Sequence, residues 1–190
     1  MRFLAFFLSL GLTALAQVPL PATGTFPSIR VQVTVGTQER ASGKDFYHKN
    51  MHIQPRAVIE GASTMVPIPA AEMQMLIITM DTRAKFAQHQ DSFKVLSTET
   101  LPVPAVPTGA RREFAFADSN VTYDGYRDNT NAGGEMYKYY VFALRDAGSK
   151  AIIDFQTNCL QLLNLSKTQP AKRDEVPRMD KGAKFPTEFK

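Results

Sequence analysis

The segment "MYKYYVFALRDAGSKAIIDFQT", residues 136–157, limits the range of folds open to this chain more than any other stretch. Two runs of apolar and aromatic residues flank the turn-forming sequence "DAGSK", in which Gly148 is free to take a positive φ. In the first run Tyr137 and Tyr139 are two residues apart, so they are expected on one face of a strand. Two such runs around a turn predict an antiparallel β-hairpin.

Other strands are indicated by the same alternation of apolar and polar residues. Residues 29–35 alternate regularly, and residues 93–97 and 111–123 do so with interruptions. Residues 75–78 are continuously apolar, which predicts a strand that is buried on both faces. About seven short strands separated by turn residues predict an all-β fold, a single antiparallel β-sandwich. In architecture it resembles immunoglobulin-like and fibronectin-like domains.

A further strand is expected at residues 51–61, where Pro55 interrupts the apolar pattern. Proline has no N–H to donate, so it is found on edge strands or at bulges. We therefore expect this strand at the edge of a sheet. A free edge offers backbone groups with which a strand of another protein can pair.

The two ends of the chain differ in composition from the predicted sandwich. Residues 1–16 have a positive charge, an apolar run and a small-residue cleavage pattern, as a signal peptide does. Residues 17–27 contain three prolines and are expected to form an extended leader. The sandwich is expected to span residues 28–166 and to close with a short helix capped by Asn158. Residues 167–190 are basic, polar and broken by prolines, which predicts a disordered tail.

Export and charge narrow the classes of function. The signal pattern predicts a periplasmic or secreted protein, and its apolar run is shorter than the ~20 residues of a membrane-spanning helix. We therefore do not expect an integral membrane protein. Of the formal net charge of +4, residues 167–190 contribute +3, with seven basic and four acidic residues. A neutral body argues against nucleic-acid binding. The single cysteine, Cys159, is expected to be a small buried residue.

Four tyrosines, Tyr123, Tyr126, Tyr137 and Tyr139, are candidate carbohydrate-binding residues. Exposed aromatic rings on one face of a sheet can stack against sugars. Aromatic residues on neighbouring strands also stabilise a sheet by packing against each other, and no tryptophan is present. We favour the packing interpretation, and keep the carbohydrate platform as the alternative.

Oxygen-bearing side chains gather just before the hairpin, at Asp118, Asn120, Asp124 and Asp128. Calcium prefers six to eight oxygen ligands from a flexible loop, so these residues are weak candidates for a calcium site. Their spacing matches no EF-hand pattern, and Asn, Asp and Gly are also ordinary turn residues. Apart from calcium, no cofactor is expected.

The sequence contains no nucleophile motif and no glycine-rich phosphate loop, so we expect no enzymatic activity. The resulting hypothesis is an exported, non-enzymatic binding or assembly module of the cell envelope or the extracellular space. Its partner is expected to be a protein that pairs with the edge at residues 51–61. The alternative is a carbohydrate-binding module that uses the tyrosines.

Overall fold

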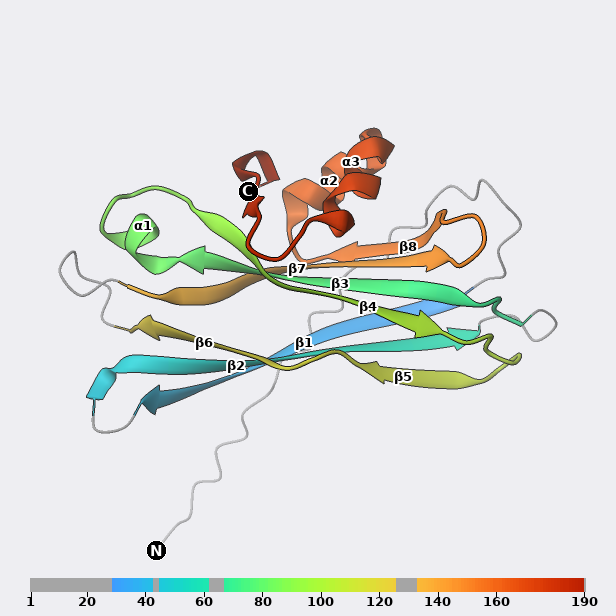
Figure 1. Cartoon of the computed structure of the whole chain (residues 1–190), viewed down its shortest axis with the longest axis horizontal. Helices are drawn as coiled ribbons and strands as arrows, with labels where there is room; N and C mark the ends of the chain where they lie inside the picture. Colours follow the sequence, from blue (N-terminus) through green and yellow to red (C-terminus); the bar gives the residue numbers. More distant parts are fainter. Residues whose placement is uncertain (1–28, 43–44, 62–66, 126–132, 190) are drawn as a thin grey trace, which may run out of the picture.

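The computed structural model describes residues 29–42, 45–61, 67–125 and 133–189. Two antiparallel sheets pack face to face, and a helical segment covers the outer face of one of them (Figure 1). The prediction of an all-β sandwich is therefore confirmed. The strands of the two sheets are β1 (Ile29–Ser42), β2 (Asp45–Gly61), β3 (Ala71–Asp81), β4 (Phe93–Val103), β5 (Arg111–Ala115), β6 (Ser119–Asp124), β7 (Glu135–Asp146), β8 (Ile152–Thr157) and β9 (Lys184–Phe185).

The four-stranded sheet places β2 between β1 on one side and β5 and β6 on the other. The prediction that residues 51–61 form an edge strand is therefore wrong. Pro55 is accommodated because it lies where β5 has ended and β6 has not begun, between the pairs Arg56↔Ala115 and Ile53↔Ser119. The N–H of Phe116 donates to the Pro55 carbonyl at 3.2 Å, so the Pro55 carbonyl faces the side of β5 and β6. The nitrogen of the same residue faces the same side, and the break in the ladder means that no strand there needs a hydrogen bond from it.

The five-stranded sheet has the order β8-β7-β3-β4-β9 and contains the predicted hairpin, which is the pair β7–β8. The hairpin turn differs in detail from the prediction. Lys150, not Gly148, has the positive φ, at 59°. The Asp146 carboxylate accepts hydrogen bonds from the N–H and the hydroxyl of Ser149, at 2.6 and 2.8 Å. A side-chain acceptor, and not glycine, therefore shapes the turn.

Two hydrophobic cores lie on the two faces of the five-stranded sheet. Met75 and Ile77 of β3 face the four-stranded sheet and belong to the first core. Leu76 and Ile78 point the other way, into a second core under the helical segment. This confirms the prediction that residues 75–78 form a strand buried on both faces.

The C-terminal part of the chain forms the helical segment that closes the second core, which corrects the expectation of a disordered tail. Val176, Phe185 and Phe189 are buried against the outer face of the five-stranded sheet. Pro170 and Pro177, two of the prolines that suggested disorder, stand in the first turns of short helices, where a missing N–H costs no hydrogen bond. The elements of this segment are α2 (Leu160–Thr168), α3 (Pro170–Glu175), η1 (Val176–Arg178), β9 and η2 (Thr187–Phe189).

One further short helix, α1 (Thr82–Phe86), follows β3, and the Asp81 carboxylate caps it by accepting from the N–H groups of Arg83 and Ala84. Among the helices that the structure describes, none is both long enough and apolar enough to cross a membrane.

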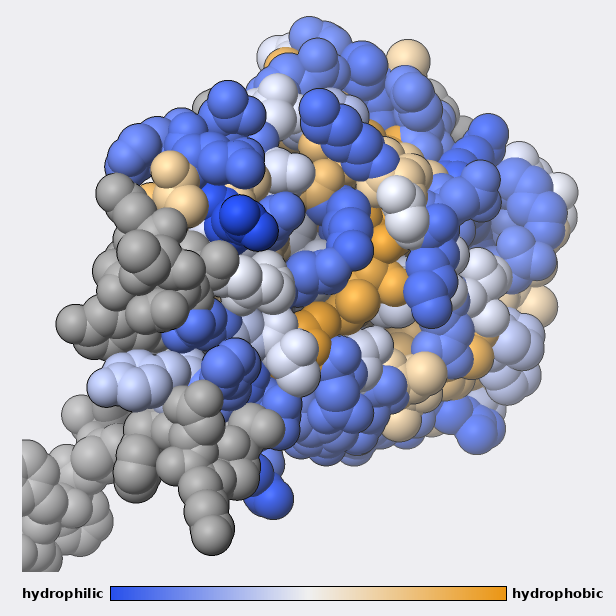
Figure 2. All heavy atoms as spheres, turned by 60° about the vertical axis from the view of Figure 1, so that its left-hand side comes forward, coloured by the Kyte–Doolittle hydropathy of each residue, from blue (hydrophilic) through white to orange (hydrophobic). Residues whose placement is uncertain are grey.

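The two sheets are joined at both margins by a bond between a side chain and the main chain. On one side the Glu99 carboxylate of β4 accepts from the Ala117 N–H, at 2.6 Å. On the other, the Gln156 amide of β8 donates to the Val31 carbonyl of β1, at 2.9 Å. Some apolar side chains that pack against the first core are only partly buried. Figure 2 shows a stripe of hydrophobic residues set in a hydrophilic surface.

Candidate functional site

A β-bulge in β7 separates the two tyrosines that were expected to share one face. Ile78 pairs with Tyr139 and Thr79 pairs with Tyr137, so Lys138 is an extra residue between them. Tyr137 consequently packs against the first core and Tyr139 against the second. The prediction that both rings lie on one face of the strand is wrong, because the inserted residue reverses the alternation.

Asn158 holds this bulge in place. Its side-chain oxygen accepts from the N–H of Tyr140 at 2.8 Å, and its amide group lies within hydrogen-bond distance of the Lys138 carbonyl and the Tyr137 hydroxyl, at 3.4 and 3.3 Å. β8 ends at Thr157, so Asn158 supplies partners where the ladder stops. It makes no capping bond to α2, whose N-cap is Cys159. The expectation that Asn158 caps the helix is therefore replaced by a role at the bulge.

The aromatic candidates contribute mainly to packing. Tyr123 is 4% exposed and lies in the first core. The Tyr139 ring lies 5.6 Å from the ring of Phe93 and 6.3 Å from that of Phe185, at tilted angles. Burial raises the pKa of the Tyr137 and Tyr139 hydroxyls. Tyr126 lies outside the described residues. The tyrosines that the structure describes do not form a flat, exposed platform.

Two of the four calcium candidates come together around His52 on the outer face of the four-stranded sheet. The two ring nitrogens of His52 lie 2.9 Å from the Asn120 side-chain oxygen and 3.2 Å from an Asp118 oxygen. Asp118 also accepts from Gln54 and Arg56, each at 3.2 Å. The hydrogen bond from Gln54, together with Arg56 and its charge, holds the pKa of Asp118 below its usual value. Asp118 therefore forms an ion pair with Arg56.

The other two calcium candidates are not brought to this cluster. Asp124 pairs with His48 across β6 and β2, and Asp128 lies outside the described residues. Within the described ranges, no group of three or more His, Cys, Asp or Glu side chains is placed to hold a metal ion. Calcium binding stays a prediction from the sequence.

Most strand edges of the sandwich are short or protected. β9 pairs with the start of β4, and Pro102 lies near the end of β4. β5 has five residues and carries the charged sequence "RRE", while β6 and β8 have six residues each. Short strands, charged residues and proline are features that keep an edge from pairing with another chain.

β1 is the exception, with 14 residues, no proline and β2 as its one strand partner in the described part of the chain. Residues 36–41 are exposed. The Val31 carbonyl bonds to β8, and Pro55, which stands opposite Val35, directs its carbonyl away from β1. Both facts give the same alternation, in which the odd-numbered residues of β1 direct their N–H and C=O groups away from β2. Val35, Thr37 and Glu39 thus present the backbone of a long sheet edge. The sequence indicated the strand but not its position at the edge.

A buried acid lies close to the start of this edge. Asp154 of β8 is 6% exposed, and burial raises the pKa of its carboxyl to about 6. The Gln156 amide lies 2.8 Å from the Asp154 carboxylate and also donates to the Val31 carbonyl. Burial and the nearby Asp154 charge raise the pKa of Tyr140 to about 12. Gln156 thus connects Asp154 of the five-stranded sheet to the Val31 carbonyl of the four-stranded sheet.

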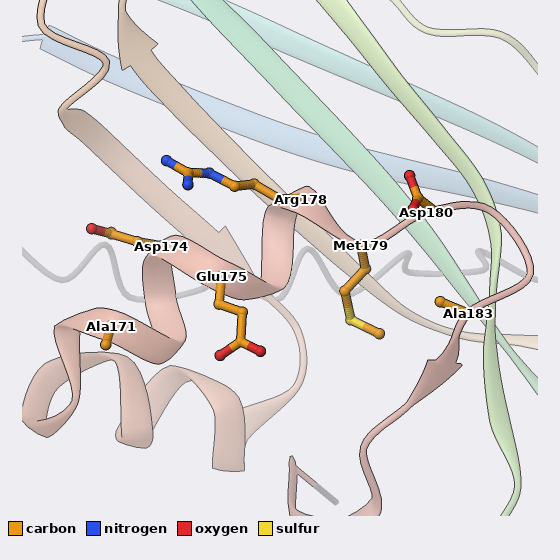
Figure 3. Close-up of a pocket in the computed structure, with 7 residues that line it drawn as sticks. All are labelled: Ala171, Asp174, Glu175, Arg178, Met179, Asp180 and Ala183. Atoms are coloured by element: carbon orange, nitrogen blue, oxygen red, sulfur yellow. The ribbon is translucent and has the colours of Figure 1, made fainter.

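A shallow pocket of about 480 Å³ lies on the helical segment. In Figure 3 the Met179 side chain points toward Ala183, whereas the Arg178 guanidinium extends away from Met179, on the same side as the Asp174 side chain. Three carboxylates and one arginine make the lining polar. The lining residues are Ala171, Asp174, Glu175, Arg178, Met179, Asp180 and Ala183.

The sequence matches no protein-family model, and no curated protein matches it. Similar solved structures include a protein from Akkermansia muciniphila, 14% identical, with a TM-score of 0.32 over 68% of this chain and 71% of that one. Another is the β-glucuronidase 2 of Bacteroides uniformis, 9% identical, with a TM-score of 0.33 over 66% of this chain. The match spans 12% of the glucuronidase. A structural-genomics target called SoR45 is 14% identical, with a TM-score of 0.27 over 68% of this chain and 85% of that one.

Proposed function

We propose that this protein is an exported, non-enzymatic binding module that recruits a protein of the cell envelope or the extracellular space by strand addition to β1. The observation that carries the proposal is the edge of β1, a 14-residue strand whose second half is exposed. Export is supported by the signal pattern of residues 1–16.

Strand addition suits this edge because the binding energy would come from backbone hydrogen bonds that the fold leaves available. The outward groups of Val35, Thr37 and Glu39 are spaced at every second residue, as a pairing strand requires. A partner strand would extend the four-stranded sheet and gain specificity from side chains on its two faces. The other edges support this mode less well, because they are shorter or carry proline and charge.

Carbohydrate binding through the tyrosines has weaker support. Tyr123 is buried, and the bulge at Lys138 places Tyr137 and Tyr139 on opposite faces of the sheet. A stacking platform needs rings that are exposed on one surface. Strand addition is therefore the better-supported mode.

The test compares two substitutions at one exposed position of β1. Thr37→Pro removes an outward N–H without touching the bonds between β1 and β2, whereas Thr37→Ala changes the side chain alone. Antibody capture from an envelope extract of the source cell should recover a protein with the wild type and with Thr37→Ala. Capture with Thr37→Pro should be at least about tenfold weaker, since a disrupted backbone contact costs about 1.4 kcal/mol or more.

As a control, the circular dichroism spectra of both variants should match the wild-type spectrum, which would show that the fold is retained. Amide hydrogen exchange then provides a second readout, because the N–H groups of Val35, Thr37 and Glu39 should exchange slowly only in the complex. Equal capture by all three proteins, or unchanged exchange at these amides, would refute strand addition to β1.

A further inference from the structure

Arg145 is a buried cation on the outer face of the five-stranded sheet. It is 7% exposed and lies on β7, directly opposite Glu72 of β3. Its guanidinium donates to two backbone carbonyls, that of Lys150 at 3.4 Å and that of Asp174 at 3.1 Å. A guanidinium has five N–H donors, and a buried charge is costly unless an opposite charge accompanies it. Two neutral carbonyls do not supply that charge.

The two acidic residues that adjoin Arg145, Glu72 across the ladder and Asp174 at its hydrogen bond, have their carboxylates bound to other cations. Glu72 pairs with the Lys150 ammonium at 2.8 Å, and Asp174 pairs with Arg173 at 3.1 Å. Among the residues that the structure describes, no ion pair to Arg145 is formed within 4 Å. Neither Glu72 nor Asp174 is therefore an ion-pair partner of Arg145.

The surroundings add positive charge to this position. Burial lowers the pKa of Arg145, and the neighbouring Arg178 and Arg173 lower it further, while Asp174 and Glu72 act in the opposite direction. Arg173 is half-buried in α3, and Arg178 is exposed at the end of η1. The backbone brings the three arginines into one region: Arg145 donates to the carbonyl of Asp174, the neighbour of Arg173 in α3, and η1, which carries Arg178, packs against β7.

We propose that Arg145, Arg173 and Arg178 form a binding site for a tetrahedral oxyanion of the phosphate or sulfate class. Guanidinium groups bind such anions through two parallel N–H···O bonds, and these bonds are strongest where the site is partly desolvated. The exposed Arg178 gives the anion access from solvent, while the buried Arg145 supplies the fixed charge. The anion would replace the counter-charge that the chain does not provide. This site is separate from the edge of β1.

The test measures binding of sodium sulfate and sodium phosphate to the full-length protein by isothermal titration calorimetry, with ionic strength held constant by sodium chloride. Arg178→Gln removes one exposed arm of the site and should weaken binding at least about tenfold. Lys181→Gln is the matched control, because Lys181 is an exposed cation of the same segment. The next residue, Gly182, bonds to Val95 on β4, away from β7. Lys181→Gln should bind as the wild type does.

Thermal unfolding separates binding from the general stabilisation that sulfate gives to proteins, since that effect is the same for all three proteins. Wild type and Lys181→Gln should gain more in Tm from sulfate than Arg178→Gln does. Glucose 6-phosphate and glucose 6-sulfate then distinguish the source of the anion. If these sugar esters bind as tightly as the inorganic ions, the natural ligand is an anionic group carried on a larger molecule. If they bind more weakly, the natural ligand is the free ion. Equal sulfate effects in all three proteins, with no heat of binding, would overturn the proposal.

Discussion

The two sheets of this sandwich differ in how many of their faces are buried. The five-stranded sheet has a hydrophobic core on each face, whereas the four-stranded sheet has one core and an outer face of polar side chains. The difference is visible in single strands, since β3 is apolar at consecutive positions and β1 alternates. The five-stranded sheet therefore depends on the C-terminal helical segment, which covers its outer face and adds β9 to its edge, and the four-stranded sheet does not.

The strongest test of this difference between the sheets is to truncate a side chain that covers the five-stranded sheet. Phe185→Ala should lower the free energy of unfolding by about 3–5 kcal/mol, because Phe185 is fully buried and its removal leaves a cavity. Val58→Ala, on the outer face of the four-stranded sheet, should cost less than about 1 kcal/mol because Val58 is partly exposed. Urea denaturation gives both values. Equal losses would show that the C-terminal segment does not stabilise the five-stranded sheet.

A second prediction compares two acids, one between the sheets and one on the outer polar face. Asp154 has a pKa raised to about 6 by burial, so its contribution to stability is complete below pH 4 and is lost as the pH rises through 6. The loss should reach about 3 kcal/mol by pH 7. Asp154→Asn should flatten this pH dependence. Urea denaturation at several pH values between 4 and 7 measures it.

Asp118 should behave in the opposite way, because its pKa is lowered. The stability that it contributes is present above its unfolded pKa and is lost as the pH falls through the folded one. Asp118→Asn should therefore leave the slope between pH 5 and 7 as it is in the wild type. If Asp154→Asn retains the wild-type slope, the buried carboxyl is not its source.

The smallest expected effect concerns the bulge that directs β7 toward both cores. Asn158→Ala removes the partner of the Tyr140 N–H and should cost about 1–3 kcal/mol. Gln161→Ala, at an exposed position of α2, is the control and should cost less than about 0.5 kcal/mol. The near-ultraviolet circular dichroism of the tyrosines should change only in Asn158→Ala. An unchanged spectrum and stability would remove Asn158 from the support of the bulge.

The parts of the fold that follow from side-chain alternation could be predicted from the sequence. The strands at residues 29–35 and 75–78 and the β7–β8 hairpin were predicted correctly, because the burial of each face selects its residues directly. Pro55 led to the wrong prediction because a proline needs a position where no neighbouring strand requires its N–H. An edge strand offers such a position, and so does a break in a neighbouring ladder. The sequence alone does not distinguish these two cases.

The candidate sites could be predicted only in part, for two physical reasons. An inserted residue such as Lys138 reverses which face a tyrosine occupies without changing the composition around it. The C-terminal segment carries its apolar residues, such as Val176 and Phe185, among many charges, so composition indicated disorder. Because that segment was expected to be mobile, the placement of Arg145, Arg173 and Arg178 in one region had no signal in the sequence.

The bonds from Glu99 to Ala117 and from Gln156 to Val31 have a mechanical consequence. A hydrophobic core holds two sheets at a given separation, but it has little directionality, so it resists sliding of one sheet over the other only weakly. Hydrogen bonds are directional and weaken steeply when their geometry is disturbed. With one such bond at each margin, a shear of the sheets would lengthen both bonds together. The two bonds therefore oppose sliding of one sheet over the other, which the core alone resists only weakly.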